Sequence, residues 1–249
     1  MDILPLSHYL DNLLDISNIP DLPNAFNGLQ VENTGDIKKI GLAVDICDAT
    51  IRMAIDQECH MVLVHHGLFW SGSQPIRGKI YKKLSTLIRN NVGLYAAHIP
   101  LDIHPLLGNS KVLADLLGLQ NPQPFGEYMG IKIGLKGTIQ SQPAKQLAKY
   151  LGRNLSTQVQ VIGERKIESI GLVTGGAGEM ICQAVEEGLD AYLTGECDHH
   201  HFHEATEGGC TLLLAGHYAT ETGGVKAIGK HLEGKFGIEC EFLHYPTGL

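Results

Sequence analysis

The stretch Ile37-Lys38-Lys39-Ile40-Gly41-Leu42 returns later in the chain as Ile167-Glu168-Ser169-Ile170-Gly171-Leu172. The two copies continue in register without a gap, through the pairs Ile51 and Ile181, Ala54 and Ala184, and Leu63 and Leu193. A duplicated strand–helix–strand unit explains this match economically, although α/β segments also resemble one another through composition alone. We therefore expect an α/β protein made of two similar lobes.

Strand-like and helix-like segments alternate along the chain, which is typical of mixed or parallel sheets covered by helices. Strands are expected at 37–44, 61–64, 94–97, 131–140, 157–162, 167–174, 191–194, 211–215 and 238–243. Helices are expected at 5–15, 48–58, 79–91, 109–117, 143–151, 179–187, 197–207 and 225–236. Prolines and glycines between Asn121 and Gly130 predict a linker or crossover. We accordingly divide the chain into lobes at 1–125 and 126–249, with a ligand cleft where their strand ends meet.

Composition limits the classes of protein that this chain can represent. Hydrophobic residues make up 43% and charged residues 18%, so a folded core is expected. No apolar run approaches the roughly 20 residues of a membrane span, and no secretory signal is visible at the N-terminus. Six cysteines without a C-x-x-C pair suit a reducing compartment, so we expect a cytoplasmic protein.

The charge balance argues against a nucleic-acid partner. The formal net charge is −8, whereas proteins that bind phosphate backbones usually carry a basic face. One basic cluster does occur at helical spacing, and a solvated helix face is its simpler interpretation. Its members are Arg77, Lys79, Lys82, Lys83 and Arg89.

Adjacent histidines follow an apolar strand in Val64-His65-His66-Gly67. A buried strand end is a costly place for imidazoles unless their nitrogens have partners, and the pair with its following glycine favours metal ligands over packed core residues. Neighbouring residues that leave a strand point in different directions. One ion would therefore be strained by both rings, whereas two ions could take one ring each.

A His-x-x-x-acid phrase occurs twice, as His98-Ile99-Pro100-Leu101-Asp102 and as His217-Tyr218-Ala219-Thr220-Glu221. Pro100 disfavours a regular helix, so we expect the first copy to be a loop that folds back. In the second copy His217 and Glu221 would share one face if a helix began there, but Gly223-Gly224 argue for a later start. Both acids can supply carboxylates, and Glu221 can bridge two cations.

These residues predict a site for two divalent metal ions. The candidate ligands are His65, His66, Asp102, His217 and Glu221. Imidazole and carboxylate without thiolate suit Zn, Mn, Fe or Ni and do not distinguish among them. So few ligands leave open positions for water, and a water between two cations becomes a nucleophile near neutral pH. His98 could be a ligand, an orienting residue or a proton carrier.

Two further stretches have weaker interpretations. The run Asp198-His199-His200-His201-Phe202-His203-Glu204 indicates an exposed helix on which His199 and His203 share a face, either solvated or near the cleft. Thr174-Gly175-Gly176-Ala177-Gly178 lies between a strand and a helix, where a glycine-rich turn can bind an anion. It matches neither a P-loop nor a dinucleotide-binding fingerprint.

Taken together, several stretches resemble the bacterial YbgI-like proteins, known as GTP cyclohydrolase 1 type 2 homologs and related to the eukaryotic Nif-three-like proteins. The resemblance spans nearly the whole chain. Its carriers are Asn27-Gly28-Leu29-Gln30-Val31, Val64-His65-His66-Gly67, His98-Ile99-Pro100-Leu101-Asp102 with His104-Pro105 and Gly108-Asn109, Thr194-Gly195-Glu196, and Gly216-His217-Tyr218-Ala219-Thr220-Glu221. The long central insertion of some relatives is absent.

The resemblance implies a duplicated α/β fold, a di-metal site and assembly as a ring-shaped homohexamer. It carries the ligand roles onto His65, His66, Asp102, His217 and Glu221, with Glu221 contacting both ions. The leading hypothesis is a metal-dependent hydrolase acting on a nucleotide or related phosphorylated small molecule, in which His98 or Glu196 moves protons. The family name suggests opening of the GTP purine ring. The alternative is a non-catalytic metal-binding scaffold or regulatory protein.

Overall fold

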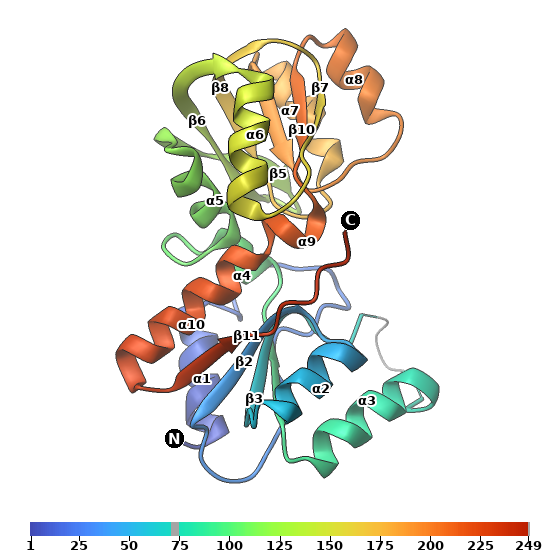
Figure 1. Cartoon of the computed structure of the whole chain (residues 1–249), viewed down its shortest axis with the longest axis vertical. Coiled ribbons are helices and arrows are strands. Elements are labelled where there is room, and N and C mark those ends of the chain that lie inside the picture. The colour runs from blue at the N-terminus through green and yellow to red at the C-terminus, as the bar shows by residue number, and fades with distance from the viewer. Residues whose placement is uncertain (71–74, 249) are drawn as a thin grey trace. The chain divides into compact units, whose positions relative to one another are not determined.

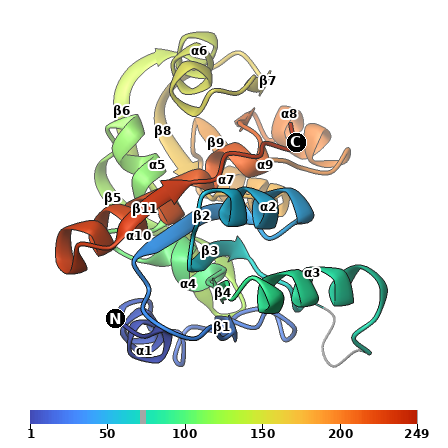
Figure 2. The ribbon, with the colours of Figure 1, turned by 60° about the horizontal axis from the view of Figure 1, so that its bottom comes forward.

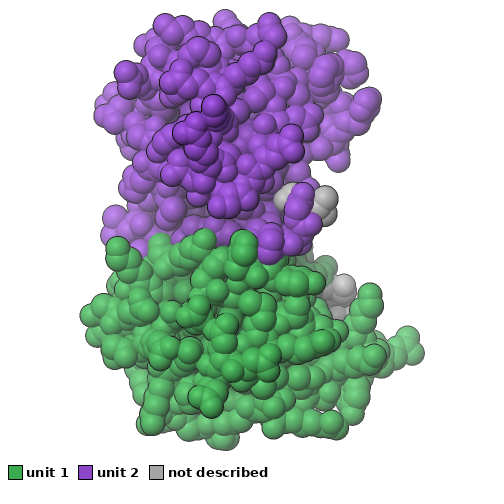
Figure 3. Space-filling model, viewed as in Figure 1, with its two compact units in different colours: residues 1–101, 224–245 green, residues 102–223, 246–249 purple. Residues whose placement is uncertain are grey.

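The computed structural model describes residues 1–70 and 75–248, which form two sheets covered by helices (Figure 1). Each sheet belongs to its own compact unit, and Figure 3 colours the two units separately. Unit 1 comprises Met1–Leu101 and Gly224–Tyr245, and unit 2 comprises Asp102–Gly223 with the residues from Pro246 onward. We had expected lobes at 1–125 and 126–249, whereas the second unit begins at Asp102 and the C-terminal strand pairs in the first sheet.

The sheet of unit 1 has the strand order β1-β4-β3-β2-β11. Four strands are parallel, and β1 at one edge is antiparallel. The strands are β1 (Gly28–Val31), β2 (Lys39–Asp45), β3 (Met61–His66), β4 (Gly93–Ala96) and β11 (Glu239–Phe242). The helices are α1 (Ile3–Leu13), α2 (Asp48–Asp56), α3 (Gly78–Arg89) and α10, which runs from Thr222 to Phe236.

Helices cover both faces of this sheet (Figure 2). Helices α2 and α3 pack on one face through Ile51, Ala54, Leu84 and Leu87, which join the alternate strand residues Val62 and Val64 in one buried cluster. On the other face Tyr95 donates a hydrogen bond to Asp11 of α1, and Gly229 of α10 lies against Leu42. Because successive strand residues point to opposite faces, the near-continuous apolar runs of β2 and β3 serve both layers.

The sheet of unit 2 has the order β5-β6-β8-β9-β10-β7. Helices α5 and α6 pack on one face, and α7 and α8 pack on the other. The strands are β5 (Gln120–Tyr128), β6 (Ile131–Pro143), β7 (Gln160–Ile162), β8 (Lys166–Leu172), β9 (Ala191–Thr194) and β10 (Thr211–Leu214). The helical segments are α4 (Ile99–Ile103), which crosses from unit 1, α5 (Asn109–Leu117), α6 (Ala144–Leu155), η1 (Gly178–Met180), α7 (Ile181–Glu186), α8 (His201–Glu207) and α9 (His217–Thr220).

The internal repeat extends to strand order and register. In both units three parallel strands lie in the same order, β4-β3-β2 and β10-β9-β8. An antiparallel strand pairs with the member of each trio that comes last in the chain, β1 with β4 and β7 with β10. Leu42 is paired with Leu63 in unit 1, and Leu172 is paired with Leu193 in unit 2. Beyond β3 and β9 the spacing between matching residues changes, from 130 for Leu42 and Leu172 to 119 for His98 and His217. Gly216, with φ of 85°, precedes His217.

Two local expectations were wrong. Residues 121–130 were expected to form a linker or crossover, but residues 121–128 lie in β5 and the last two form the turn to β6. The prolines of β5 are tolerated because β5 is an edge strand. His98–Asp102 was expected to form a loop, yet residues Ile99–Ile103 form the short helix α4. Pro100 sits in the first turn of α4, where its missing N–H costs no helical hydrogen bond.

Among the residues that the structure describes, none of the helices has the length and apolar character needed to cross a membrane.

Candidate metal-binding site

Three histidines converge at the carboxyl edge of the unit 1 sheet. His65 and His66 end β3, and His98 follows the neighbouring parallel strand β4. The ring centroid of His65 lies 4.6 Å from that of His66 and 5.0 Å from that of His98. One nitrogen from each ring lies within 4.8 Å of the others, so these three residues could hold a metal ion. We call them the three-histidine cluster.

Each ring of this cluster is oriented by an oxygen atom at Nδ1. The partners are the Ala97 carbonyl for His65 at 2.9 Å, the Asp45 carboxylate for His66 at 2.9 Å and the Asp21 carboxylate for His98 at 2.8 Å. A carbonyl or carboxylate oxygen accepts, so Nδ1 must donate its proton in each case. Nε2 is then the nitrogen with which each ring would bind a cation.

The loop before β1 forms hydrogen bonds with the three-histidine cluster. The Asn27 side chain accepts from the backbone N–H of His98 at 2.7 Å and donates to Asp21 at 2.8 Å. Burial acts to raise the pKa of Asp21, but hydrogen bonding and attraction from His98 outweigh it and hold that pKa below its usual value. Gln30 accepts from the backbone N–H of Leu68 and fills the space beside Gly67, so a side chain at position 67 would collide with it.

A second group of candidate ligands lies in unit 2, where helix α9 begins at His217. His217 Nε2 lies 3.2 Å from Glu221 Oε1, the contact expected for residues four apart on a helical turn. His217 Nδ1 donates to Glu196 at 2.7 Å. Hydrogen bonding to Glu221, opposed by burial and reinforced by Glu196, raises the pKa of His217 to about 9. In the metal-free protein at neutral pH, a proton therefore occupies the nitrogen that a metal would use.

Asp102 joins this group through the turn that follows β8. One oxygen of Asp102 accepts from Thr174 at 3.0 Å and from Asn109 at 2.9 Å. Carboxylate oxygens of Asp102 and Glu221 lie within 4.8 Å of one another. Glu221 is 4% exposed and lies close to both Asp102 and His217, which suits a ligand shared by two ions.

The glycine-rich turn 174–178 closes around these side chains. Gly175 has φ of 71°, and a Cβ there would lie 2.2 Å from the Glu221 carboxylate. A Cβ on Gly195 would meet the Gly175 carbonyl and the His217 backbone at 2.6 Å. The turn thus accommodates a carboxylate and an imidazole, and its use as an anion site stays a prediction.

The candidate ligands therefore fall into two sets by the unit that carries them, His65 and His66 with His98 in unit 1, and Asp102 with His217 and Glu221 in unit 2. Glu196, which we had considered as a proton carrier, is hydrogen-bonded to Nδ1 of His217 and so has the geometry of an orienting residue.

The histidine run forms a separate group in unit 2. Asp198, His200 and His201 bring ligand atoms within 4.8 Å of one another, and the rings of His199 and His203 are 5.9 Å apart. His201 is buried, however, and accepts a hydrogen bond from the Asp198 N–H, so this part of the run is not the exposed helix that we expected.

Sequence reasoning missed the residues that orient the ligands. Asp21, Asp45 and Thr174 lie 77, 21 and 72 residues from the side chains that they contact. Asp45 alone carried a signal, because it ends β2 beside the strand that delivers His66.

Comparison with known proteins gives a consistent result. Residues 1–247 match the model of the family described as Duf34/NIF3 (NGG1p interacting factor 3). Two relatives named "GTP cyclohydrolase 1 type 2 homolog" come from Deinococcus radiodurans and Pyrococcus abyssi. The first is 38% identical and covers 98% of this chain and 93% of its own; the second is 40% identical and covers 97% of each chain.

Solved structures match over the full length as well. A structure described as "protein ybgI, unknown function" has a TM-score of 0.93 at 33% identity, and TTHA1606 from Thermus thermophilus has a TM-score of 0.91 at 41% identity, each covering 100% of both chains. Reduced HcgD from Methanocaldococcus jannaschii has a TM-score of 0.86 at 26% identity, covering 98% of both chains.

Proposed function

Because the chain belongs to the Duf34/NIF3 family, we propose that it is a dinuclear metal-dependent hydrolase acting on a nucleotide or a related phosphorylated small molecule. One observation carries the proposal: His65, His66, His98 and His217 each donate Nδ1–H to an oxygen. An imidazole held in this way by a carboxylate or carbonyl is the arrangement found behind metal-bound histidines. Four histidines oriented in the same way favour metal ligands over four separately packed core residues.

We propose that His65, His66, Asp102, His217 and Glu221 together bind two divalent cations. The donor set of imidazole and carboxylate, with no thiolate, fits Zn, Mn, Fe or Ni. When bound, such cations supply Lewis acidity and make water acidic enough to be a nucleophile near neutral pH.

The protein's own residues prepare this chemistry. Thr174 and Asn109 hold one oxygen of Asp102, and Glu196 fixes the ring of His217. His98, backed by Asp21, presents Nε2, which could either bind a cation beside His65 and His66 or hold and move a proton during hydrolysis. The names of the relatives favour a purine nucleotide as substrate.

The test compares Glu221→Gln with the wild-type protein and with Glu207→Gln, an exposed control on α8. We expect wild type to bind two divalent ions per chain and to hydrolyse at least one member of a nucleotide panel. Glu221→Gln should retain its fold by circular dichroism but lose turnover, whereas Glu207→Gln should behave as wild type. Full metal occupancy with no turnover on any nucleotide would reject the hydrolase and favour a metal-binding scaffold.

We also propose that the protein assembles as a ring-shaped homohexamer in the cytoplasm. The family resemblance supports the assembly, and six cysteines present as free thiols suit a reducing compartment. Light scattering should give six times the 27.0 kDa of one chain. A monomeric mass at micromolar concentration would contradict the assembly without affecting the proposal for the metal site.

A further inference from the structure

A pocket of about 450 Å³ opens beside the three-histidine cluster, entirely within unit 1. It runs from the end of β3 to the start of α3. Its polar and aromatic lining comes from Asp45, His66, Trp70, Arg77, Lys79 and Lys83. It thus contains one candidate metal ligand together with three of the five basic residues that the sequence presented as a solvated helix face.

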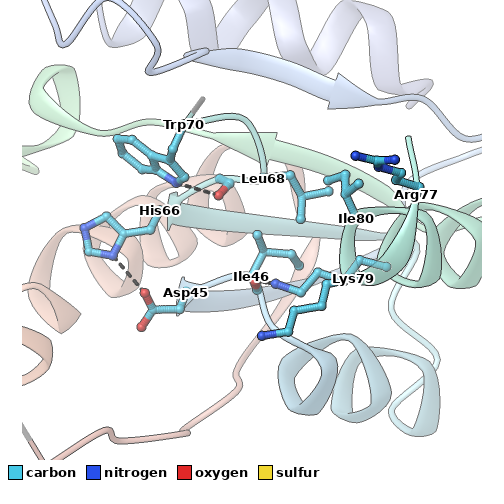
Figure 4. A pocket seen from close by; sticks show the side chains of 10 residues that line it. Asp45, Ile46, His66, Leu68, Trp70, Arg77, Lys79 and Ile80 are labelled. Carbon is cyan, nitrogen blue, oxygen red and sulfur yellow. Dashed lines mark hydrogen bonds and ion pairs between the residues drawn. The ribbon is translucent and has the colours of Figure 1, made fainter. Parts of the chain in front are cut away.

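The pocket has two chemically different ends, shown in Figure 4. His66, Asp45 and Trp70 lie at one end and Arg77 lies at the other, with the apolar side chains of Ile46, Leu68 and Ile80 between them. Asp45 is hydrogen-bonded to His66, so the carboxylate is directed toward the histidine end. Lys83 reaches the Ile46 carbonyl between these ends. A ligand lying along the pocket therefore meets a metal-binding group first, then an apolar surface with a lysine beside it, then Arg77.

The basic side chains of the pocket are suited to an anion. Arg77, Lys79 and Lys83 supply three positive charges against the single carboxylate of Asp45. Helix α3 begins at Gly78 without a side-chain cap and without an acidic residue in its first turn, so its N–H groups add to the attraction for an anion. Arg77 and Lys79 are exposed, whereas Lys83 is half-buried and its amino group donates to the Ile46 carbonyl at 2.9 Å.

The other end offers a flat wall for a ring. The indole N–H of Trp70 donates to the Gly67 carbonyl at 2.8 Å, which fixes the side chain. Its ring stands edge-on to His98, with ring centroids 5.0 Å apart. A fixed, half-buried indole is a surface on which a heterocycle can stack.

We propose that this pocket binds a phosphorylated heterocyclic small molecule, with its phosphate at Arg77 and Lys79 and its ring toward Trp70 and His66. This inference rests on the proposed function and narrows it. The phosphate is held at the end away from the candidate metal ligand, so the bond exposed to hydrolysis belongs to the ring and not to the phosphoester. This orientation of the ligand is the one expected of an enzyme that hydrolyses the ring and not of a phosphatase.

The experiment measures binding of GMP and guanosine, two probes that differ only in the phosphate, by calorimetry on the purified assembly. The variant Arg77→Ala/Lys79→Ala removes the exposed cations, and Lys83 is left in place because of its backbone contact. The control Lys82→Ala/Arg89→Ala removes the same charge from exposed positions of α3 that do not line the pocket. Thermal melts verify that both variants fold.

We expect wild type and the control to prefer GMP over guanosine by about tenfold or more, and Arg77→Ala/Lys79→Ala to lose that preference. Equal binding of the two probes by wild type, or a preference that survives in Arg77→Ala/Lys79→Ala, would overturn the proposal. So would failure of both GMP and pyrophosphate to bind, or tighter binding of a single-stranded oligonucleotide than of GMP.

The two proposals fail in different ways. If the GMP preference depends on Arg77 and Lys79 but no nucleotide is turned over, the phosphate site stands and the hydrolase does not. If metal-dependent turnover is found and Arg77→Ala/Lys79→Ala leaves its KM unchanged, the hydrolase stands and the phosphate site does not. Release of inorganic phosphate from GMP would contradict the assigned orientation.

Discussion

Asp45 and His66 are cross-strand partners whose side chains form a hydrogen bond of 2.9 Å, from His66 Nδ1 to the Asp45 carboxylate. They occupy the last positions of β2 and β3, on the same face of the sheet. The parallel pairing thus fixes which nitrogen of His66 would bind a cation, and a substitution at Asp45 tests whether that orientation matters.

Asp45→Ala should lower the affinity for divalent metal about 10- to 100-fold, since the ring of His66 loses the acceptor that fixes its tautomer. Asp45→Asn should lose less, because the amide oxygen still accepts from Nδ1. Competition with a chromophoric chelator measures both. Asp48→Ala, an exposed acid on α2, is the control and should bind metal as wild type does. Equal affinities for all four proteins would remove Asp45 from the site.

Gly175→Ala should impair metal binding through a collision with Glu221. Gly188→Ala is a matched control, because Gly188 has φ of 70° against 71° for Gly175, but a Cβ added there would have no described atom within 4 Å. Both variants should lose about 1 kcal/mol or more of stability from backbone strain. Only Gly175→Ala should lose metal, as measured by elemental analysis after dialysis. Similar metal content in the two variants would contradict the close packing around Glu221.

Metal binding should strengthen with rising pH up to about pH 9, because a cation must displace the proton that His217 retains in the metal-free protein. Glu196→Gln removes one of the groups that raise this pKa, so the pH profile of affinity should move to lower pH. Glu207→Gln should leave it unchanged. The readout is the dissociation constant measured across that pH range, and an identical profile for Glu196→Gln would contradict the prediction.

The same pKa has a consequence for stability in the metal-free protein. The folded value of about 9 lies above the ordinary 6.5, so protonated His217 stabilises the fold fully below pH 6.5. That contribution disappears as the pH rises through 9. The difference in melting temperature between wild type and His217→Gln should therefore be largest in mild acid and should shrink above pH 9.

Asp190 should stabilise unit 2 through its carboxylate, which accepts from the backbone N–H groups of Glu168 and Ser169 and from the Ser169 hydroxyl. Burial opposes ionisation, but these donors outweigh it and hold the pKa of Asp190 below 3.8. Its stabilisation is thus present above pH 3.8 and is lost as the pH falls through the folded pKa.

Asp190→Ala should cost about 2 kcal/mol of unfolding free energy at neutral pH, and the difference from wild type should shrink in acid. Urea titrations at neutral pH and in acid measure this difference in unfolding free energy. Asp115→Ala, which removes an exposed ion pair with Lys111, should cost about 0.5 kcal/mol or less. An Asp190→Ala cost that is small at neutral pH or independent of pH would contradict the prediction.

The sequence by itself determined the α/β class, the repeated strand–helix–strand unit and the candidate ligands. The pattern of apolar residues predicts strands and helices locally. The repeat in which Leu42 corresponds to Leu172 can be recognised from the sequence without coordinates. His65, His66 and His217 stood out because imidazoles after buried strands are costly without partners. Local chemistry was sufficient for these conclusions.

Tertiary structure decided what surrounds those ligands. The pairing of β11 with β2 places the C-terminal strand in unit 1. The edge position of β5 allows this strand to contain prolines. Asp21 reaches His98 across 77 residues, and Arg77 and Lys79 line a pocket with His66. Such contacts depend on strand order and on the face to which a residue points, and neither can be read from neighbours in the chain.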